Sequence, residues 1–136
     1  MELEHLKGLE YSFEIIVDNS ITASAVGSGG VDVLSTPSMI LLFEQSSRNA
    51  VQPSLPKGYT TVGIKVDIEH LSATPVGEKV RVNARVTKVD GRQIFYEVNA
   101  FDEHGIIGKG THTRFTVNLK RFMEKIGQRN NNQIGK

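Results

Sequence analysis

Apolar and polar residues alternate in several stretches of the chain, which is the pattern of a β-strand with one buried face. The alternating stretches are Tyr11 to Val17, Val62 to Ile68, Val80 to Val86, Ile94 to Ala100 and a longer segment from Ile106 to Leu119. The dipeptides Asp90-Gly91 and His104-Gly105 suit tight turns between strands. The pattern therefore predicts one early strand and, later, an antiparallel run of about four strands.

One segment has helical rather than alternating periodicity. It contains a set of residues that recur at spacings of three and four, namely Met39, Leu42, Phe43, Ser46 and Ala50. The run Ser35-Thr36-Pro37 is a start signal, because a hydroxyl can cap a helix and Pro is tolerated in the first turn. We expect a helix from Thr36 to about Ala50. Ile40 and Leu41 make it apolar around most of its circumference, which is typical of a buried helix.

The remaining segments predict a loop, a short helix and a tail. Asp18 to Val31 is rich in Ser and Gly, which favours a flexible loop that could act as a lid. Lys120 to Ile126 could form a short terminal helix, and the polar, Asn-rich segment Gly127 to Lys136 predicts a disordered tail. Residues 1–126 then form a single domain.

The order of these elements indicates a fold. A sheet with one apolar face must cover that face, and the only predicted helix long enough is Thr36 to Ala50. The expected architecture is α+β, with a curved antiparallel sheet wrapped around one long central helix, the hotdog arrangement.

Composition narrows the chemistry that the chain can perform. Sixteen basic residues face fifteen acidic ones, so the net charge is +1 and no basic face predicts nucleic-acid binding. Cysteine is absent, which excludes disulfides and thiolate nucleophiles, and four scattered histidines predict no metal site. The start of the chain has no apolar run that would indicate a signal or a membrane span, so we expect a cytoplasmic protein. Carboxylate, imidazole, hydroxyl and backbone amide groups remain as candidates.

Two ionisable residues stand out by their position. Glu44 lies within the most apolar stretch of the chain, where an ionised carboxylate needs a partner or a shifted pKa. It could equally lie on a solvated stripe of the helix beside Ser47 or Arg48. His70 ends a predicted strand and has a side chain suited to general acid or base chemistry. As a lone histidine it could also be a loop residue without a role.

Two smaller residues have structural explanations as good as functional ones. Thr36 could cap the helix, which would account for it fully. Gly63 lies inside a predicted strand, where glycine marks either a bulge or a close approach of the backbone to a ligand.

Taken together, these residues resemble the fluoroacetyl-CoA thioesterase family of hotdog proteins over roughly Gly8 to Ile126. The resemblance is carried by Thr36 and Glu44 eight residues apart, Gly63 seven residues before His70, the run His70-Leu71-Ser72-Ala73-Thr74-Pro75-Val76-Gly77, Gly91-Arg92, and Gly110-Thr111-His112-Thr113-Arg114. It implies a catalytic set of Thr36, Glu44 and His70, with Gly63 in contact with the substrate. The implied reaction is hydrolysis of an acyl-CoA thioester, without a metal or a further cofactor.

The residue types suit this reaction. A carboxylate can attack the thioester carbonyl or activate water, an imidazole can protonate the leaving thiolate, and a hydroxyl can steady the carboxylate or the oxyanion. In a regular helix, however, Thr36 and Glu44 lie roughly 12 Å apart. The substrate could lie between them, the helix could start late, or the residues could meet across the dimer interface that the resemblance implies. We expect a homodimer with two equivalent sites.

The sequence does not specify the acyl group of the substrate, and it leaves two alternative functions. The segment Ile21 to Ser35 is rich in Gly and Ser and lacks Phe, whereas the fluoroacetyl-specific enzyme has an aromatic residue in its lid. We therefore expect a short-chain or other small acyl-CoA substrate. The rivals are a hotdog hydratase or dehydratase and a non-catalytic acyl-CoA-binding module.

Overall fold

The computed structural model describes residues 2–134. The strands are β1 (Glu10–Ile16), β2 (Tyr59–His70), β3 (Lys79–Asp90), β4 (Gln93–Asp102) and β5 (Gly105–Asn118). The helices are α1 (Ala23–Val26), α2 (Thr36–Val51) and α3 (Leu119–Ile134), with single 3₁₀ turns at Glu4–Leu6, Asn19–Ile21 and Gln52–Ser54. No helix within these residues is long and apolar enough to cross a membrane.

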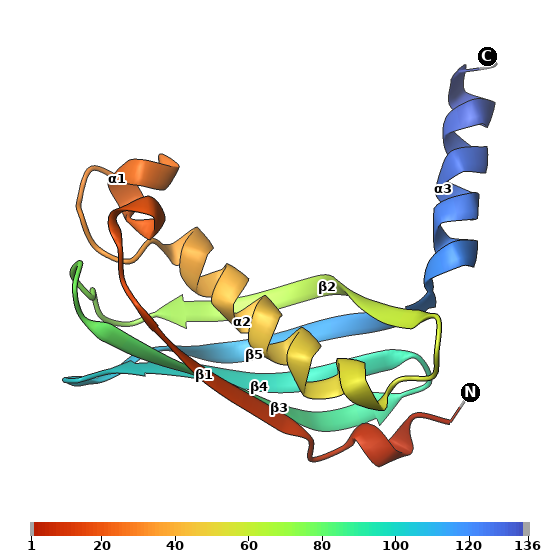
Figure 1. The fold of residues 1–136 in the computed structure, drawn as a ribbon, viewed down its shortest axis with the longest axis horizontal. Helices are drawn as coiled ribbons and strands as arrows, with labels where there is room; N and C mark the ends of the chain where they lie inside the picture. The colour runs from red at the N-terminus through yellow and green to blue at the C-terminus, as the bar shows by residue number, and fades with distance from the viewer. Residues whose placement is uncertain (1, 135–136) are drawn as a thin grey trace.

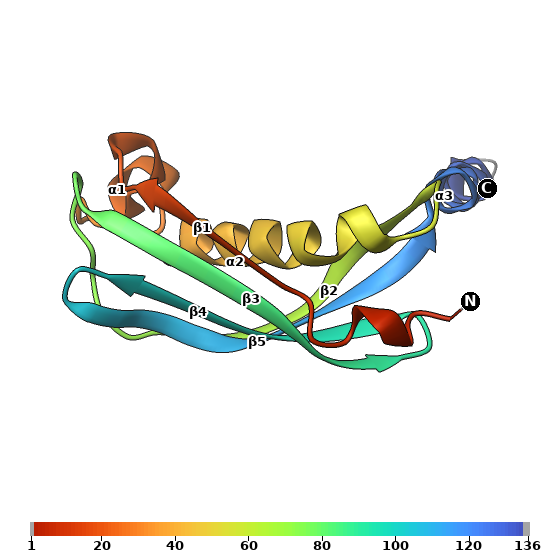
Figure 2. The ribbon, with the colours of Figure 1, turned by 60° about the horizontal axis from the view of Figure 1, so that its bottom comes forward.

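The five strands form one antiparallel sheet in the order β1-β3-β4-β5-β2. The sheet curves around α2, which lies across its concave face (Figures 1 and 2). β1 forms one edge of the sheet and β2 forms the other, where it pairs with β5 alone. This is the predicted α+β hotdog arrangement, and it leaves one long side of β2 without a neighbouring strand.

The core lies between α2 and the concave face of the sheet. Met39 and Phe43 are fully buried on α2, and they belong to one cluster with Val82 and Tyr96 of the central strands. The helical spacing of the apolar residues on α2 and the alternation along β3 and β4 are what bring these side chains to a common interior.

The helix α2 begins at Thr36 as predicted, but the residue that caps it is Ser35. Ser35 is the cap, and its hydroxyl accepts a hydrogen bond from the Ser38 amide at 3.1 Å. Thr36 is the first helical residue and Pro37 the second. The helix is not buried all round, because Leu41 is 52% exposed.

The glycines of β5 provide close contacts rather than bulges. A Cβ at Gly110 would lie 2.0 Å from the Asp67 carbonyl oxygen on β2, and one at Gly108 would lie 2.5 Å from the sulfur of Met39. Gly110 pairs regularly with β2 and β4, whereas Gly108 lies next to a register shift between β4 and β5 at Ala100. The register shift between β2 and β5 falls between Gly63 and Lys65.

The segment predicted as a flexible loop is ordered by hydrogen bonds. The Thr22 hydroxyl caps α1 by accepting from the Ala25 amide at 3.2 Å, and the Ala23 amide donates to the Val33 carbonyl at 2.9 Å. The Leu34 amide donates to the Thr74 carbonyl at 2.8 Å, which ties the segment to the chain beyond β2. We call residues 22–34 the lid segment; a lid function remains a prediction.

The terminal helix is longer than the sequence predicts. α3 includes the expected segment Lys120 to Ile126 and continues to Ile134 through residues for which we expected a disordered tail. Residues 135 and 136 lie outside the described residues, and the division of the chain at residue 126 remains a prediction. α3 projects from the sheet past the free edge of β2 (Figure 1).

Candidate active site

Thr36 and His70 form a hydrogen-bonded pair at one end of the fold. The end of β2 places His70 beside the first residue of α2, and the Thr36 hydroxyl oxygen lies 2.7 Å from His70 Nδ1. Because Ser35 caps the helix, the Thr36 hydroxyl is available for this contact. The structural explanation of Thr36 as a cap is therefore wrong, and its side chain instead orients the imidazole.

The other nitrogen of His70 is available for chemistry. Its Nε2 is buried and has no hydrogen-bond partner among the described residues. Burial lowers the pKa of His70 below its ordinary value of 6.5, because desolvation disfavours the charged ring. The ring is therefore neutral at neutral pH and can exchange a proton through Nε2 with a bound molecule.

A cavity of about 350 Å³ lies beside this pair. Thr36 and His70 line it together with the lid segment and the first residues after β2, including Val31, Leu34 and Leu71. Its walls are mostly small and apolar, which suits a small acyl group. Glu44 does not line it.

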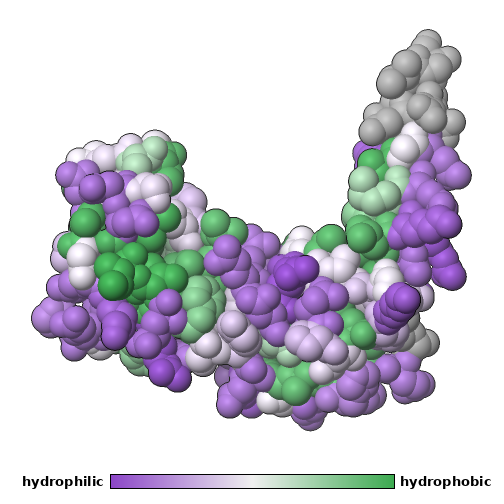
Figure 3. Space-filling model, in the orientation of Figure 1, coloured by the Kyte–Doolittle hydropathy of each residue, from purple (hydrophilic) through white to green (hydrophobic). Residues whose placement is uncertain are grey.

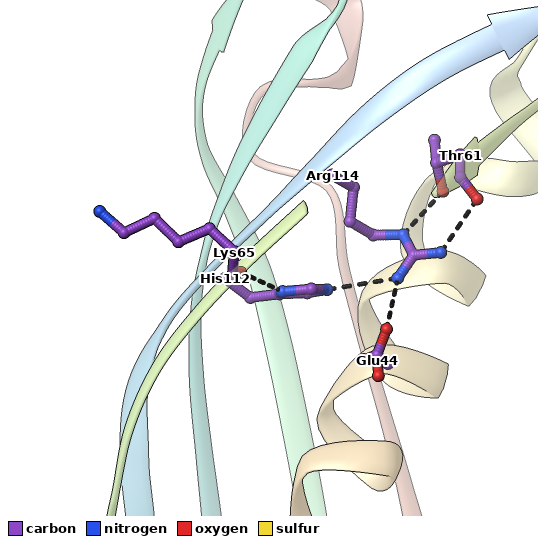
Figure 4. A network of polar contacts seen from close by, with 5 residues as sticks. All are labelled: Glu44, Thr61, Lys65, His112 and Arg114. Carbon is purple, nitrogen blue, oxygen red and sulfur yellow. Dashed lines mark hydrogen bonds and ion pairs between the residues drawn. The ribbon is translucent and has the colours of Figure 1, made fainter. Parts of the chain in front are cut away.

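Glu44 lies in a second polar group, at the middle of α2 (Figure 4). Its Oε2 is 3.5 Å from Nη1 of Arg114 on β5. The side chain of Arg114 is only 7% exposed, whereas that of Glu44 is 40% exposed. The carboxylate therefore has its partner across the fold, and neither of the neighbours considered from the sequence, Ser47 and Arg48, fills this role.

Arg114 is held firmly by groups other than Glu44. Its Nε donates to the Thr61 hydroxyl at 2.8 Å and its Nη2 donates to the Thr61 carbonyl at 3.0 Å. Burial lowers the pKa of Arg114, and the nearby Glu44 carboxylate opposes that effect; the guanidinium stays charged at neutral pH because its ordinary pKa is far higher. A fixed, buried positive charge thus lies beside a partly exposed carboxylate.

His112 completes this group and has a defined proton position. Its Nδ1 lies 2.7 Å from the Lys65 carbonyl, which can only accept, so Nδ1 carries the proton. Its Nε2 then accepts from Arg114 Nη1 at 3.2 Å. Burial lowers the pKa of His112, and its ring stacks on Tyr96 with the ring centres 5.9 Å apart.

Gly63 is in direct contact with this group. A Cβ at Gly63 would lie 2.7 Å from Glu44 Oε2, 3.2 Å from His112 Cε1 and 3.3 Å from Arg114 Nη1. Glycine is therefore required at this position for the carboxylate to lie where it does. Contact of Gly63 with substrate remains a prediction.

Arg114 and His112 are not among the site residues predicted from the sequence. The available signal was their spacing, because residues two apart on a strand share a face. Both lie in the run of residues 110–114 that carries the resemblance to the thioesterase family. The sequence could not show which residue of α2 lies opposite that face of β5, and the structure shows that it is Glu44.

The two polar groups are separate within one chain. α2 is helical from Thr36 onward, so a late start of the helix does not bring Thr36 to Glu44. The helical rise separates the two residues by roughly 12 Å. Across residues 2–134 no cluster of three or more His, Asp or Glu side chains is arranged to hold a metal ion.

A family model and a known protein match this chain, and both are fluoroacetyl-CoA thioesterases. Residues 17–120 match the family model described as fluoroacetyl-CoA-specific thioesterase. The fluoroacetyl-CoA thioesterase of Streptantibioticus cattleyicolor is 35% identical over 98 residues, which cover 72% of this chain and 70% of that protein.

Solved structures agree with this match. A crystal structure of a mutant fluoroacetyl-CoA-specific thioesterase superposes with a TM-score of 0.84 at 29% identity, covering 90% of this chain and 96% of the other. A thioesterase superfamily member of Thermus thermophilus superposes with a TM-score of 0.87 at 26% identity and covers 96% of each chain. A hot-dog-like protein from Thermanaerovibrio acidaminovorans, 21% identical, shares the fold with a TM-score of 0.85 and covers 92% of this chain and 94% of its own. The fold, the match over residues 17–120 and the identity to a thioesterase place the chain in the family of fluoroacetyl-CoA-specific thioesterases.

Proposed function

We propose that this protein is a homodimeric hydrolase that converts a small acyl-CoA thioester into the free acid and CoA. Thr36, Glu44 and His70 are the catalytic residues and Gly63 borders the reacting carbonyl. The observation that carries the proposal is the hydrogen bond between Thr36 and His70, which leaves a neutral imidazole with a free buried nitrogen beside a small apolar cavity.

The chemistry follows from the state of each group. Glu44 either attacks the thioester carbonyl carbon, forming a mixed anhydride that water then hydrolyses to the free acid, or removes a proton from a water molecule that attacks this carbon. In both routes the carbon–sulfur bond breaks and releases the CoA thiolate. His70 supplies a proton to that thiolate. CoA is part of the substrate, so the reaction needs no additional cofactor. The related fluoroacetyl-CoA-specific enzyme has been crystallised with acetyl-CoA as a threonine-to-serine mutant, and the acetyl group of that ligand is of a size that suits the cavity.

The free edge of β2 supports the dimer. Ile64 and Val66 are apolar residues of β2 and are 53% and 41% exposed. An unpaired edge with exposed apolar side chains is normally covered in a native protein. Two copies can cover it by antiparallel pairing of β2 with its symmetry mate, which joins the two sheets and sets the two α2 helices side by side.

This pairing also unites the two polar groups. Thr36 contacts His70, and Glu44 contacts Gly63. Consider a two-fold axis that passes midway between Gly63 and His70 on β2 and midway between Thr36 and Glu44 on α2. This axis sets the Thr36–His70 pair of one protomer beside the Glu44–Gly63 pair of the other. The exposed Val66 and Leu41 lie close to those midpoints, where the two copies would meet first. Each dimer then has two composite sites, and no side chain has to span 12 Å of helix.

Thiol release from a panel of acyl-CoAs tests the activity. The chain contains no cysteine, so every thiol detected comes from CoA. We expect turnover on at least one small acyl-CoA. Saturable binding without turnover across the panel would make the protein a binding module, and hydration of an enoyl-CoA without thiol release would make it a hydratase.

Mixed dimers test the composite site. Glu44→Gln and His70→Ala are each expected to inactivate the homodimer. After the two variants exchange subunits at random, half of the dimers are mixed and each mixed dimer has one intact site of two, so about a quarter of wild-type activity returns. No recovery on mixing, with exchange verified by mass, would show that Glu44 and His70 act within one chain.

A further inference from the structure

α3 and the lid segment lie at opposite ends of β2. The Leu119 amide, at the start of α3, donates to the Gly58 carbonyl at 3.0 Å, which places α3 at the beginning of β2. The lid segment is attached at the other end, where the Leu34 amide donates to the Thr74 carbonyl and Val33 bridges to Pro75. Both extend toward the side of the free edge of β2 (Figure 1).

Antiparallel pairing of β2 exchanges these two ends. In the register that sets Gly63 of one protomer level with the partner's His70, Gly58 and Tyr59 come level with the partner's Pro75 and the partner's Thr74. The start of α3 then lies beside the partner's lid segment. α3 has 16 residues and is therefore about 24 Å long, enough to extend across that segment.

α3 presents an apolar stripe that is largely exposed among the described residues. Leu119, Met123 and Ile126 are exposed, and their spacing puts them on one side of the helix. Phe122 beside them is half-buried and lines a pocket with Phe115 of its own chain. In the space-filling view, the hydrophobic side of α3 faces the hollow between the two projecting segments (Figure 3). A stripe of this kind on a projecting helix needs a surface to cover it.

The lid segment has matching properties. Val26 and Val31 are exposed apolar residues on it. The lid segment, residues 22–34, contains one aspartate, Asp32, and no Lys or Arg. Residues 119–129 of α3 contain four basic residues and the single acidic residue Glu124. The two surfaces are therefore complementary both in their apolar residues and in their charge.

We propose that α3 of each protomer docks its apolar stripe on the lid segment of the other protomer and so closes the wall of the cavity beside the partner's Thr36 and the partner's His70. The inference rests on the proposed dimer and goes beyond it. It gives α3 a positioning role: the helix holds the lid segment over the acyl cavity from the partner subunit. The residues that line a given cavity then come from both chains.

Cross-linking tests this arrangement directly, because the natural chain contains no cysteine. Double variants that carry Met123→Cys with either Val26→Cys or Val31→Cys would be treated with a short bismaleimide. We expect a covalent dimer in denaturing gels. Within one chain, the lid cysteine and the α3 cysteine lie at opposite ends of β2, too far apart for a short cross-linker. The control is Gln128→Cys with the same lid substitution, because Gln128 lies on the opposite side of α3, and it should cross-link weakly.

The outcomes separate this inference from the proposed dimer. Covalent dimers from the Met123 variants and not from the control support the docking of α3. If light scattering shows dimers but neither Met123 pair cross-links, or the control cross-links equally, the inference is wrong and the dimer stands. If the wild-type protein is a monomer, both are wrong.

A second measurement uses no cysteine. The double variant Met123→Glu with Ile126→Glu should remain a dimer through β2, while amide hydrogen exchange across residues 22–34 becomes faster than in wild type. KM for the acyl-CoA should rise more than kcat falls. A dimer with unchanged exchange in the lid segment and unchanged kinetics would overturn the role of α3.

Discussion

The two polar groups proposed to form the active site are built in different ways. At the start of α2, Thr36 and His70 share one hydrogen bond, and His70 Nε2 has no partner among the described residues. At the middle of α2, Glu44 faces Arg114, which also bonds Thr61 and His112. The first region is open beside a cavity, and the second is a nearly complete polar network.

The difference indicates what each region contributes. A buried network whose hydrogen bonds are satisfied fixes positions and charges, so the Arg114 group sets where Glu44 lies. A buried nitrogen without a partner is costly unless something binds it, so His70 is the group prepared for a ligand. His70 thus belongs to the groups proposed to react, whereas Arg114 and its partners position Glu44.

The largest effect is expected for Glu44→Gln. The amide keeps the size of the side chain and can still bond Arg114, but it has no negative charge for attack or proton abstraction. Turnover should fall by at least about 10²-fold in a protein that folds, dimerises and binds acyl-CoA. The double variant with His70→Ala should lose little more than either single variant, because residues that act as one unit are not additive.

A matched control is Glu97→Gln, at an exposed position on β4. Glu97 also pairs with an arginine, at 3.1 Å from Arg85, but both side chains are exposed. Its loss should leave turnover unchanged. Near wild-type hydrolysis by folded Glu44→Gln, or an equal loss in Glu97→Gln, would contradict the assignment of Glu44.

Gly63→Val should reduce turnover by a factor of roughly 10 to 100. Its side chain would displace the Glu44 carboxylate, since even a Cβ there lies 2.7 Å from Oε2. Glu44 is partly exposed and can move, so the loss of activity should exceed the loss of thermal stability. Thermal melts beside kinetics check this, and a parallel loss of both would make Gly63 a purely structural residue.

Thr36→Val should affect mainly turnover, whereas Ser35→Ala should affect mainly stability. The first removes the hydrogen bond to His70, worth about 1 kcal/mol, so turnover should fall about fivefold with little change in stability. The second removes the cap of α2 and should cost about 1 kcal/mol of unfolding free energy with little change in the chemistry. Kinetics and denaturant titration of both variants show whether capping and catalysis are divided between neighbouring residues.

The smallest effect concerns pH. Burial lowers the pKa of both His70 and His112 in the folded protein, whereas the unfolded chain binds protons near pH 6.5. Below that pH the unfolded state therefore holds more protons, and stability should fall as the pH decreases. Melting temperatures measured from neutral pH down to about pH 5 should decline, and His112→Gln should show a shallower decline. A flat profile in the wild type would contradict the buried neutral state of these rings.

The sequence determined the elements and much of the candidate chemistry. Alternation predicted the strands, helical spacing with Ser35-Thr36-Pro37 predicted α2 to within a residue at each end, and the spacing of Thr36, Glu44, Gly63 and His70 indicated the thioesterase family. These features are local or depend on fixed separations along the chain, so they can be read without a structure. The length of α3 beyond Ile126 was not predicted, because a polar, Asn-rich segment carries little helical signal.

Only the tertiary structure decided which residue meets which. It gave the cap to Ser35 and freed Thr36 for His70, and it paired Glu44 with Arg114, seventy residues later in the chain. It also showed that Gly63 leaves room for that carboxylate. Such contacts arise where a helix crosses a curved sheet, and the curvature and register of the sheet set them. A pattern of residues along one chain specifies the faces of its elements, but packing alone decides which side chains on those faces come into contact.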